Sequence, residues 1–244
     1  MLLIRPHTKD VGFPVKRLLP AAQQQSVGPF LFFDHMGPAL FEPDTTAGDV
    51  RPHPHIGLST VTYLYSGAML HRDSLGVVQR IEPGAINLMT AGHGIVHSER
   101  IPEDIRRQQT VVEGIQTWMA LPQALEETDP AFIHHDANTL PELTGPGWRI
   151  RVLLGSLWDH VSPVRTLSPT LYLDIQLEPD ARLALPPLIA AEERALYLAH
   201  GEGLKVGNTP VPRHHVITLT EGDALIESGD QPVRLMAFGG QALE

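Results

Sequence analysis

Short runs of apolar and β-branched residues alternate with turn-forming residues along the first half of the chain. The run LSTVTYLY is rich in the residue types that strands favour. Ser66-Gly67 ends this run, and Pro83-Gly84 ends a later one. This spacing is typical of an antiparallel meander, which can close into a small barrel. The strands predicted in this part are residues 58–65, 77–81 and 85–90.

The same pattern resumes in the second half, after a stretch of different composition. Residues 126–145 contain two prolines and five acidic residues, and we expect a connector there. This divides the chain into a first barrel over residues 1–125 and a second over residues 146–244. Residues 103–109 are mostly charged and predict either one helical turn or a loop. Further strands are predicted at residues 111–121, 149–154, 171–175, 195–199 and 216–219.

The composition agrees with an all-β chain. Of the 244 residues, 22 are prolines and 21 are glycines, as expected of many short strands and turns. No stretch of about 18 apolar residues predicts a transmembrane helix, and the apolar run before Arg5 is too short for a secretory signal. The absence of cysteine fits a cytoplasmic protein, which we expect. A net charge of −10 argues against direct binding to nucleic acid.

Two pairs of possible metal ligands flank the predicted strands. His53 and His55 form one pair, and His97 and Glu99 form the other, each with one residue between its members. On a strand, residues two apart point to the same face. On a helix the same spacing would separate them by roughly 200°. Because the surrounding sequence is strand-like, we expect both pairs to meet at the centre of the first barrel.

Three imidazoles and one carboxylate make a donor set that suits a divalent metal ion. The residues themselves leave Fe(II), Mn(II), Ni(II), Cu(II) and Zn(II) open. The lack of cysteine excludes a thiolate-rich structural zinc site. An octahedral ion would keep about two positions for water, substrate or dioxygen. The competing interpretation, that these are core or loop residues, leaves four titratable groups in an interior without a compensating ion.

The other histidines and the tryptophans are interpreted as structural. His71 and Asp73 could line the mouth of the barrel, but a solvated turn is the favoured interpretation. Asp34 either orients a metal ligand or makes a structural hydrogen bond. Adjacent histidines diverge on a strand, so the doublets do not predict chelation. Surface or turn roles are therefore expected for His134, His135, His214 and His215. The tryptophans are most simply packing residues; these are Trp118, Trp148 and Trp158.

Several segments resemble the signature segments of the pirin family. These are HPHIG at residues 53–57, MTAGHGIVHSE at residues 89–99, VGPFLFFDH at residues 27–35 and PTLYLD at residues 169–174. The resemblance extends over most of the chain and is densest between about residues 27 and 100. His93 departs from the family, since many pirins carry arginine there, and pirins commonly continue into a helical tail beyond the position of Glu244.

The resemblance implies a bicupin, with two antiparallel cupin-type β-barrels in one chain and a metal site in the N-terminal barrel alone. It matches His53, His55, His97 and Glu99 with the iron ligands of the family, so that Fe(II) becomes the expected ion. Pirins also resemble quercetin 2,3-dioxygenases. We therefore expect ring opening of a flavonol-like substrate by dioxygen, with Glu99 acting both as a ligand and as a general base.

Two other functions remain open at this stage. Pirins also resemble partners of transcription factors, so the chain could be an iron-binding, redox-sensitive regulatory protein that acts through a protein partner. A third hypothesis keeps a metal-dependent enzyme but removes dioxygen, as in an isomerase or hydrolase of small molecules. The order of preference is dioxygenase, then regulator, then enzyme without dioxygen.

Overall fold

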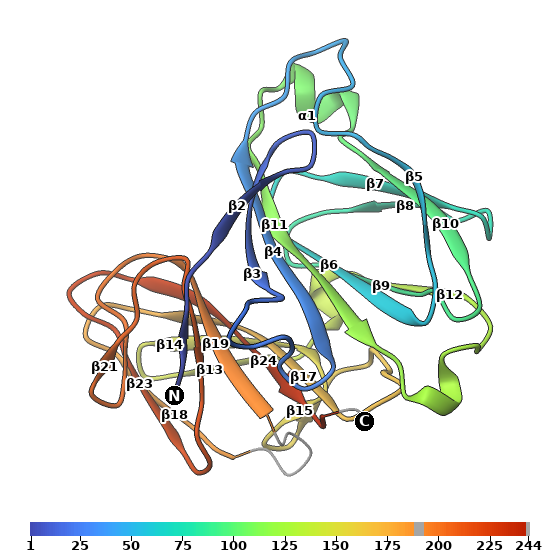
Figure 1. Cartoon of the computed structure of the whole chain (residues 1–244). Helices are drawn as coiled ribbons and strands as arrows, with labels where there is room; N and C mark the ends of the chain where they lie inside the picture. The colour runs from blue at the N-terminus through green and yellow to red at the C-terminus, as the bar shows by residue number, and fades with distance from the viewer. Residues whose placement is uncertain (188–192, 243–244) are drawn as a thin grey trace. The chain divides into compact units, whose positions relative to one another are not determined.

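A computed structural model describes residues 1–187 and 193–242 of the chain. The chain forms two compact units, each made from more than one segment (Figure 1). The N-terminal unit contains residues 7–19 and 31–139, and the C-terminal unit contains residues 1–6, 20–30 and the described part of residues 140–243. Both units are built almost entirely from antiparallel strands. No helix in the described part is long and apolar enough to cross a membrane.

Two sheets face each other in the N-terminal unit (Figure 1). The larger sheet has the order β12 (Ala131–His135), β9 (Ile86–Thr90), β6 (Leu58–Ser66), β11 (Val112–Ala120), β4 (Phe30–Ala39), β3 (Pro14–Leu19) and β2 (His7–Asp10). The smaller sheet has the order β5 (Val50–His55), β10 (Ile95–Arg100), β7 (Met69–Asp73) and β8 (Val78–Ile81). The helical segments of this unit are α1 (Glu103–Arg107), η1 (Gln123–Leu125) and η2 (Ala137–Thr139).

The interior of this unit changes from apolar to polar along its strands. On β6, Thr62 and Leu64 share one face because they are two residues apart. Leu64 belongs to an apolar cluster with residues such as Met69 and Ile105. Thr62, in contrast, lies 3.4 Å from a carboxylate oxygen of Glu99. One part of the interior is therefore a packed core, and the other part holds titratable side chains.

The C-terminal unit has the same architecture with a different interior. Its larger sheet has the order β1 (Leu3–Ile4), β22 (Val216–Thr218), β19 (Glu193–His200), β24 (Val233–Gly240), β17 (Thr170–Leu177), β14 (Trp148–Leu154) and β13 (Glu142–Gly145). A smaller sheet has the order β18 (Arg182–Leu185), β23 (Ala224–Glu227), β20 (Lys205–Val206) and β21 (Thr209–Pro210). A separate two-stranded sheet pairs β15 (Ser156–Leu157) with β16 (His160–Val161). An apolar cluster, which includes the fully buried Leu173, Leu196 and Leu235, fills this interior.

The fold confirms the expected all-β class and adds details that the sequence pattern did not give. Residues 103–109 contain the short helix α1, one of the two alternatives. Residues 126–145, expected as a connector, contain β12 and β13. These strands extend the sheets of the two units, because β12 pairs with β9 and β13 pairs with β14. At the other end of the chain, β1 pairs with β22 of the C-terminal unit.

A buried arginine fixes the segment that leads into β5. Arg106 on α1 is 2% exposed and donates hydrogen bonds to the carbonyl oxygens of Ala47 (2.8 Å) and Ile101 (3.2 Å). It also forms an ion pair with Asp49 at 2.8 Å. Residue 50 begins β5, so this arginine holds the chain immediately before the strand that carries His53 and His55.

We expect Arg106→Leu to destabilise the N-terminal unit by about 3 kcal/mol, because breaking a buried ion pair leaves Asp49 and two carbonyl oxygens without their partner. The shift of the urea midpoint measures this loss. Arg107→Leu is the matched control, since Arg107 is exposed and its ion pair with Glu103 lies at the surface. The control should change stability by less than about 0.5 kcal/mol. Equal effects of the two substitutions would contradict the role of Arg106.

Candidate metal centre

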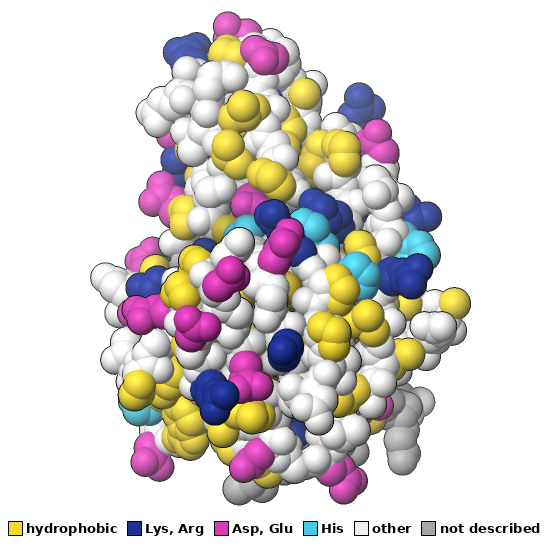
Figure 2. Space-filling view, turned by 90° about the vertical axis from the view of Figure 1, so that its left-hand side faces the viewer, with side chains coloured by type: hydrophobic (Ala, Val, Ile, Leu, Met, Phe, Trp, Pro, Cys, Tyr) yellow, Lys and Arg dark blue, Asp and Glu magenta, His cyan; other side chains and the backbone are white. Residues whose placement is uncertain are grey.

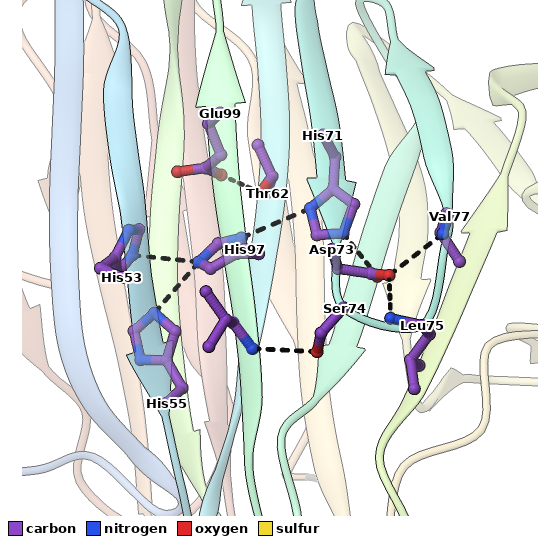
Figure 3. Close-up of polar contacts among 11 residues, drawn as sticks. His53, His55, Thr62, His71, Asp73, Ser74, Leu75, Val77, His97 and Glu99 are labelled. Atoms are coloured by element: carbon purple, nitrogen blue, oxygen red, sulfur yellow. Dashed lines mark hydrogen bonds and ion pairs between the residues drawn. The ribbon is translucent and has the colours of Figure 1, made fainter.

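Three histidines converge on the inner face of the smaller sheet of the N-terminal unit (Figure 3). β5 and β10 are antiparallel neighbours, and His97 lies directly opposite His53 in the register. His55 follows two residues after His53 and therefore points to the same face. Both ligand fragments are thus extended, as the sequence predicts.

The spacing of the three imidazoles fits one metal ion. The Nε2 atom of His97 lies 3.0 Å from Nε2 of His53 and 3.1 Å from Nε2 of His55. Two nitrogens bound at right angles to one ion, each about 2.1 Å away, would lie roughly 3.0 Å apart. Nitrogen lone pairs at this separation repel unless a proton or a metal ion lies between them. The donor set and its geometry therefore fit a divalent cation.

The protonation of these rings also favours metal binding. Nδ1 of His53 lies 2.8 Å from the carbonyl oxygen of Arg51, so it donates its proton there and leaves Nε2 free. Burial lowers the pKa of His97 to about 3, with a further contribution from the neighbouring imidazoles. Burial and His53 together lower the pKa of His55 to about 4. Neutral imidazoles, the form that binds metals, thus prevail at neutral pH.

Glu99 lies beside the three histidines, but its carboxylate is not in the group of ligand atoms within 4.8 Å of one another. The pairing of β10 with β5 shifts register between His97 and Glu99, and the extra residue lies on β5, since β10 pairs with β7 over the same residues without a shift. The carboxyl group is buried, and burial raises its pKa. The Thr62 hydroxyl can donate either to Glu99 (3.4 Å) or to the side-chain oxygen of Gln116 (2.9 Å).

The favoured interpretation of His71 and Asp73 as a solvated turn is wrong. Both residues belong to β7, His71 is 5% exposed, and Nδ1 of His71 lies 3.4 Å from Nδ1 of His97. Nε2 of His71 lies 2.8 Å from a carboxylate oxygen of Asp73. The turn begins at Asp73, the last residue of β7, and the Asp73 side chain still points into the barrel. The signal that could have revealed this pair is its spacing, which repeats that of the two ligand pairs.

Aromatic side chains flank the histidines on two sides. The Trp118 ring lies edge-on to His55 at 5.1 Å and stacks on Phe32 at 4.2 Å. Phe132 on β12 stacks on His71 at 4.3 Å. The sequence pattern predicts a packing role for Trp118 and gives no signal for Phe132, because the face on which each ring lies depends on strand register. Asp34 takes the structural alternative, in which both of its carboxylate oxygens accept hydrogen bonds from Arg17 at 2.9 Å.

Other histidines lie outside this site. His93 is exposed and lies 3.5 Å from Asp129. In the expected structural roles, His134 contacts Asn87 at 2.7 Å and His214 contacts the Tyr197 hydroxyl at 3.2 Å. Among the described residues of the C-terminal unit, no group of three histidine or carboxylate ligands lies within 4.8 Å of one another.

Comparison with known proteins gives matches over nearly the whole chain. The family model described as pirin matches residues 12–119, and the pirin C-terminal cupin domain matches residues 172–244. A "Pirin-like protein" from Caulobacter vibrioides is 40% identical over 98% of this chain and 83% of its own length. A protein named "Putative quercetin 2,3-dioxygenase PA1205" from Pseudomonas aeruginosa is 40% identical over 94% of this chain and 70% of its own length.

The fold gives a match of similar extent among solved structures. A crystal structure of quercetin 2,3-dioxygenase from Acinetobacter baumannii superposes with a TM-score of 0.89 at 32% sequence identity. The match covers all of this chain and 79% of that chain. Sequence and fold therefore lead to the same group of relatives.

We expect a divalent metal ion to stabilise the protein, and His97→Ala to abolish this effect. At a free metal concentration 100 times the dissociation constant, bound metal should add about 2.7 kcal/mol to the free energy of unfolding. Thermal unfolding with and without Zn(II) measures the difference. His93→Ala is the control, because His93 is exposed and outside the site. Loss of metal stabilisation in the control as well would contradict the ligand assignment.

The metal-free protein should lose stability as the pH falls below about 6.5. The pKa values of His97 and His55 are lowered in the folded state, so the unfolded chain binds more protons below the ordinary histidine pKa. Each histidine that stays neutral then contributes a slope approaching about 1.4 kcal/mol per pH unit, until the pH nears its folded pKa. Urea unfolding in chelator-treated samples between pH 7 and pH 5 measures the slope. His97→Phe should make it shallower, and an unchanged slope would refute this assignment.

Proposed function

Since the chain belongs to the pirin family, we propose that it is a metal-dependent dioxygenase that opens the ring of a flavonol such as quercetin. The observation that carries the proposal is the convergence of three imidazole Nε2 atoms, with separations of 3.0 and 3.1 Å, beside a buried carboxylate. The names of the relatives from Pseudomonas aeruginosa and Acinetobacter baumannii support the choice of reaction.

His53, His55, His97 and Glu99 are the proposed metal ligands, and Fe(II) is the proposed ion. Imidazole and carboxylate donors suit Fe(II) and also Mn(II), Ni(II), Cu(II) and Zn(II), so availability and redox chemistry decide among them. Thr62 contacts Oε1 of Glu99 at 3.4 Å, so Oε2 of the same carboxylate is the oxygen proposed to join the three histidines at the metal ion.

The metal ion, when bound, supplies positive charge that stabilises an anionic enolate oxygen and a redox centre for reaction with dioxygen. Glu99 is proposed to accept the proton of the flavonol hydroxyl. Burial raises the pKa of its carboxyl group, which makes the carboxylate a stronger base than one in water. Thr62 orients this carboxylate through its hydroxyl group. The low exposure of His97 and Glu99 (2% and 8%) limits competing contact with bulk water.

The net charge and the face seen in Figure 2 give no reason to prefer direct contact with nucleic acid. On the face seen in Figure 2, lysine and arginine side chains are scattered among aspartate and glutamate rather than gathered in one basic patch. This agrees with the net charge of −10. A regulatory function would therefore have to act through a protein partner. The experiment below separates the dioxygenase from this function and from an enzyme that does not use dioxygen.

We expect the iron-loaded protein to consume dioxygen and release carbon monoxide in equal amounts when quercetin is added. Glu99→Gln should lower kcat by roughly 10²- to 10⁴-fold, the usual contribution of a general base, because the amide cannot take up the hydroxyl proton. An oxygen electrode with carbon monoxide detection measures the reaction, and metal analysis before and after the assay shows whether the variant still holds iron.

Glu126→Gln is the control, since Glu126 lies in the turn after η1, is exposed, and has no role in the proposed site. Bound iron without oxygen uptake would sink the dioxygenase proposal and favour the regulatory function. Turnover of another small molecule under anaerobic conditions with Zn(II) would instead favour an isomerase or hydrolase.

A further inference from the structure

We propose that His71 and Asp73 form a positioning pair that fixes the tautomer and the orientation of His97 as a metal ligand. This inference rests on the proposed metal site and adds two residues that act on it through His97. The pair belongs to β7, which is the neighbour of β10 in the smaller sheet of the N-terminal unit. In the register of these strands, His97 lies opposite Asp73, and Glu99 lies opposite His71.

The hydrogen bonds of the pair form a chain that ends at His97 (Figure 3). The backbone N–H groups of Leu75 and Val77 donate to Oδ1 of Asp73, at 2.9 and 3.1 Å. The other carboxylate oxygen, Oδ2, lies 2.8 Å from Nε2 of His71. Nδ1 of His71 lies 3.4 Å from Nδ1 of His97. Each link in the chain is therefore anchored by the one before it.

With both rings neutral, only one arrangement of protons satisfies this chain. An ionised carboxylate only accepts hydrogen bonds, so His71 must carry its proton on Nε2 and donate it to Asp73. Nδ1 of His71 then has a free lone pair and accepts the Nδ1 proton of His97. With its proton on Nδ1, His97 keeps the lone pair of Nε2, the atom that lies beside His53 and His55. Asp73 thereby determines which nitrogen of His97 faces the metal site.

His53 must also carry its proton on Nδ1 to leave Nε2 free, and a single hydrogen bond to the backbone achieves this. Its Nδ1 donates directly to the backbone carbonyl of Arg51 at 2.8 Å. His97 instead uses a buried side chain that is itself held by a carboxylate. Metal-bound histidines typically donate their second nitrogen to a carboxylate, a carbonyl or water, which fixes the ring and raises its basicity. The negative charge of Asp73 polarises the ring of His71, which strengthens the hydrogen bond that Nδ1 of His71 accepts from His97.

The surroundings of His71 hold this ring in one orientation. His71 stacks on Phe132, with 4.3 Å between ring centroids and 25° between planes. The Asp73 side chain in the ion pair is 0% exposed, and that of His71 is 6% exposed. Arg72, between them on β7, is exposed and points to the opposite face. The pair therefore differs from its neighbour in burial and in contacts.

Asp73→Asn tests the inference because asparagine is nearly the same size as aspartate but should reverse the direction of the hydrogen bonds from residue 73 to His97. The amide oxygen of the asparagine should stay with the N–H groups of Leu75 and Val77, so that its NH₂ group faces His71. His71 must then accept at Nε2 and carry its proton on Nδ1. The proton of His97 would in turn move to Nε2, the proposed metal ligand.

The first measurement follows the ring protons in the metal-free protein by long-range ¹H–¹⁵N spectra at neutral pH. The wild-type protein should show His97 protonated on Nδ1 and His71 protonated on Nε2, and Asp73→Asn should reverse both. The second measurement is the affinity for Zn(II), by competition with a chelator. Asp73→Asn and His71→Phe should weaken binding by roughly 10- to 100-fold.

Two further variants separate positioning from packing. His71→Asn places an amide oxygen near the former Nδ1 position and should recover part of the affinity lost in His71→Phe. Arg72→Gln should leave both measurements unchanged. Thermal unfolding without metal shows whether each variant is folded. A merely structural role predicts a lower melting temperature with unchanged ring protons and unchanged zinc affinity, and that result overturns the inference.

The outcomes also separate this inference from the proposed function. If the wild-type protein binds Zn(II) and Asp73→Asn binds it equally well, the positioning role is refuted and the metal site stands. If the wild-type protein binds no divalent ion, the proposed function fails and the positioning role fails with it. Reversed ring protons together with weaker zinc binding support both.

Discussion

The antiparallel pairing of β5 with β10 is the interaction on which the candidate metal centre depends. It places His97 opposite His53, and the two-residue period of a strand then brings His55 to the same face. A shift of this register by one residue would turn one pair of side chains to the outer face of the sheet. The backbone hydrogen bonds of two strands therefore determine whether three imidazoles meet.

The surrounding elements supply what this pairing leaves open. Arg106 holds the segment before β5, Thr62 contacts the carboxylate of Glu99, and the Asp73–His71 contact settles the proton position on His97. These contacts come from segments on both sides of the ligand strands. A divalent ion would complete the arrangement, because it offsets the cost of burying neutral imidazoles and a carboxylate close together.

The sequence predicted the ligand strands because their context left few alternatives. His53, His55 and His97 have the spacing of a strand face and are flanked by strand-forming residues. His71 and Asp73 have the same spacing, but the run from Asp73 to Gly76 is also a strong turn signal, and this signal decided the interpretation. Trp118 and Phe132 could not be placed because their facing depends on which strands are neighbours, information that no local pattern contains. β12 was missed for the same reason, since its sequence mixes polar and apolar residues and it forms a strand by pairing with β9.

The contrast between the two units is an argument for function that does not depend on the relatives. Both units consist of antiparallel sheets around an interior, and the C-terminal unit fills that interior with leucine, isoleucine and valine. The N-terminal unit gives up part of the same stabilisation to bury His55, His71, His97 and Glu99. Burying such groups lowers stability unless a ligand or a hydrogen bond satisfies each of them. Since the C-terminal unit shows that this architecture does not require polar groups inside, their presence in the N-terminal unit is best explained by what they bind.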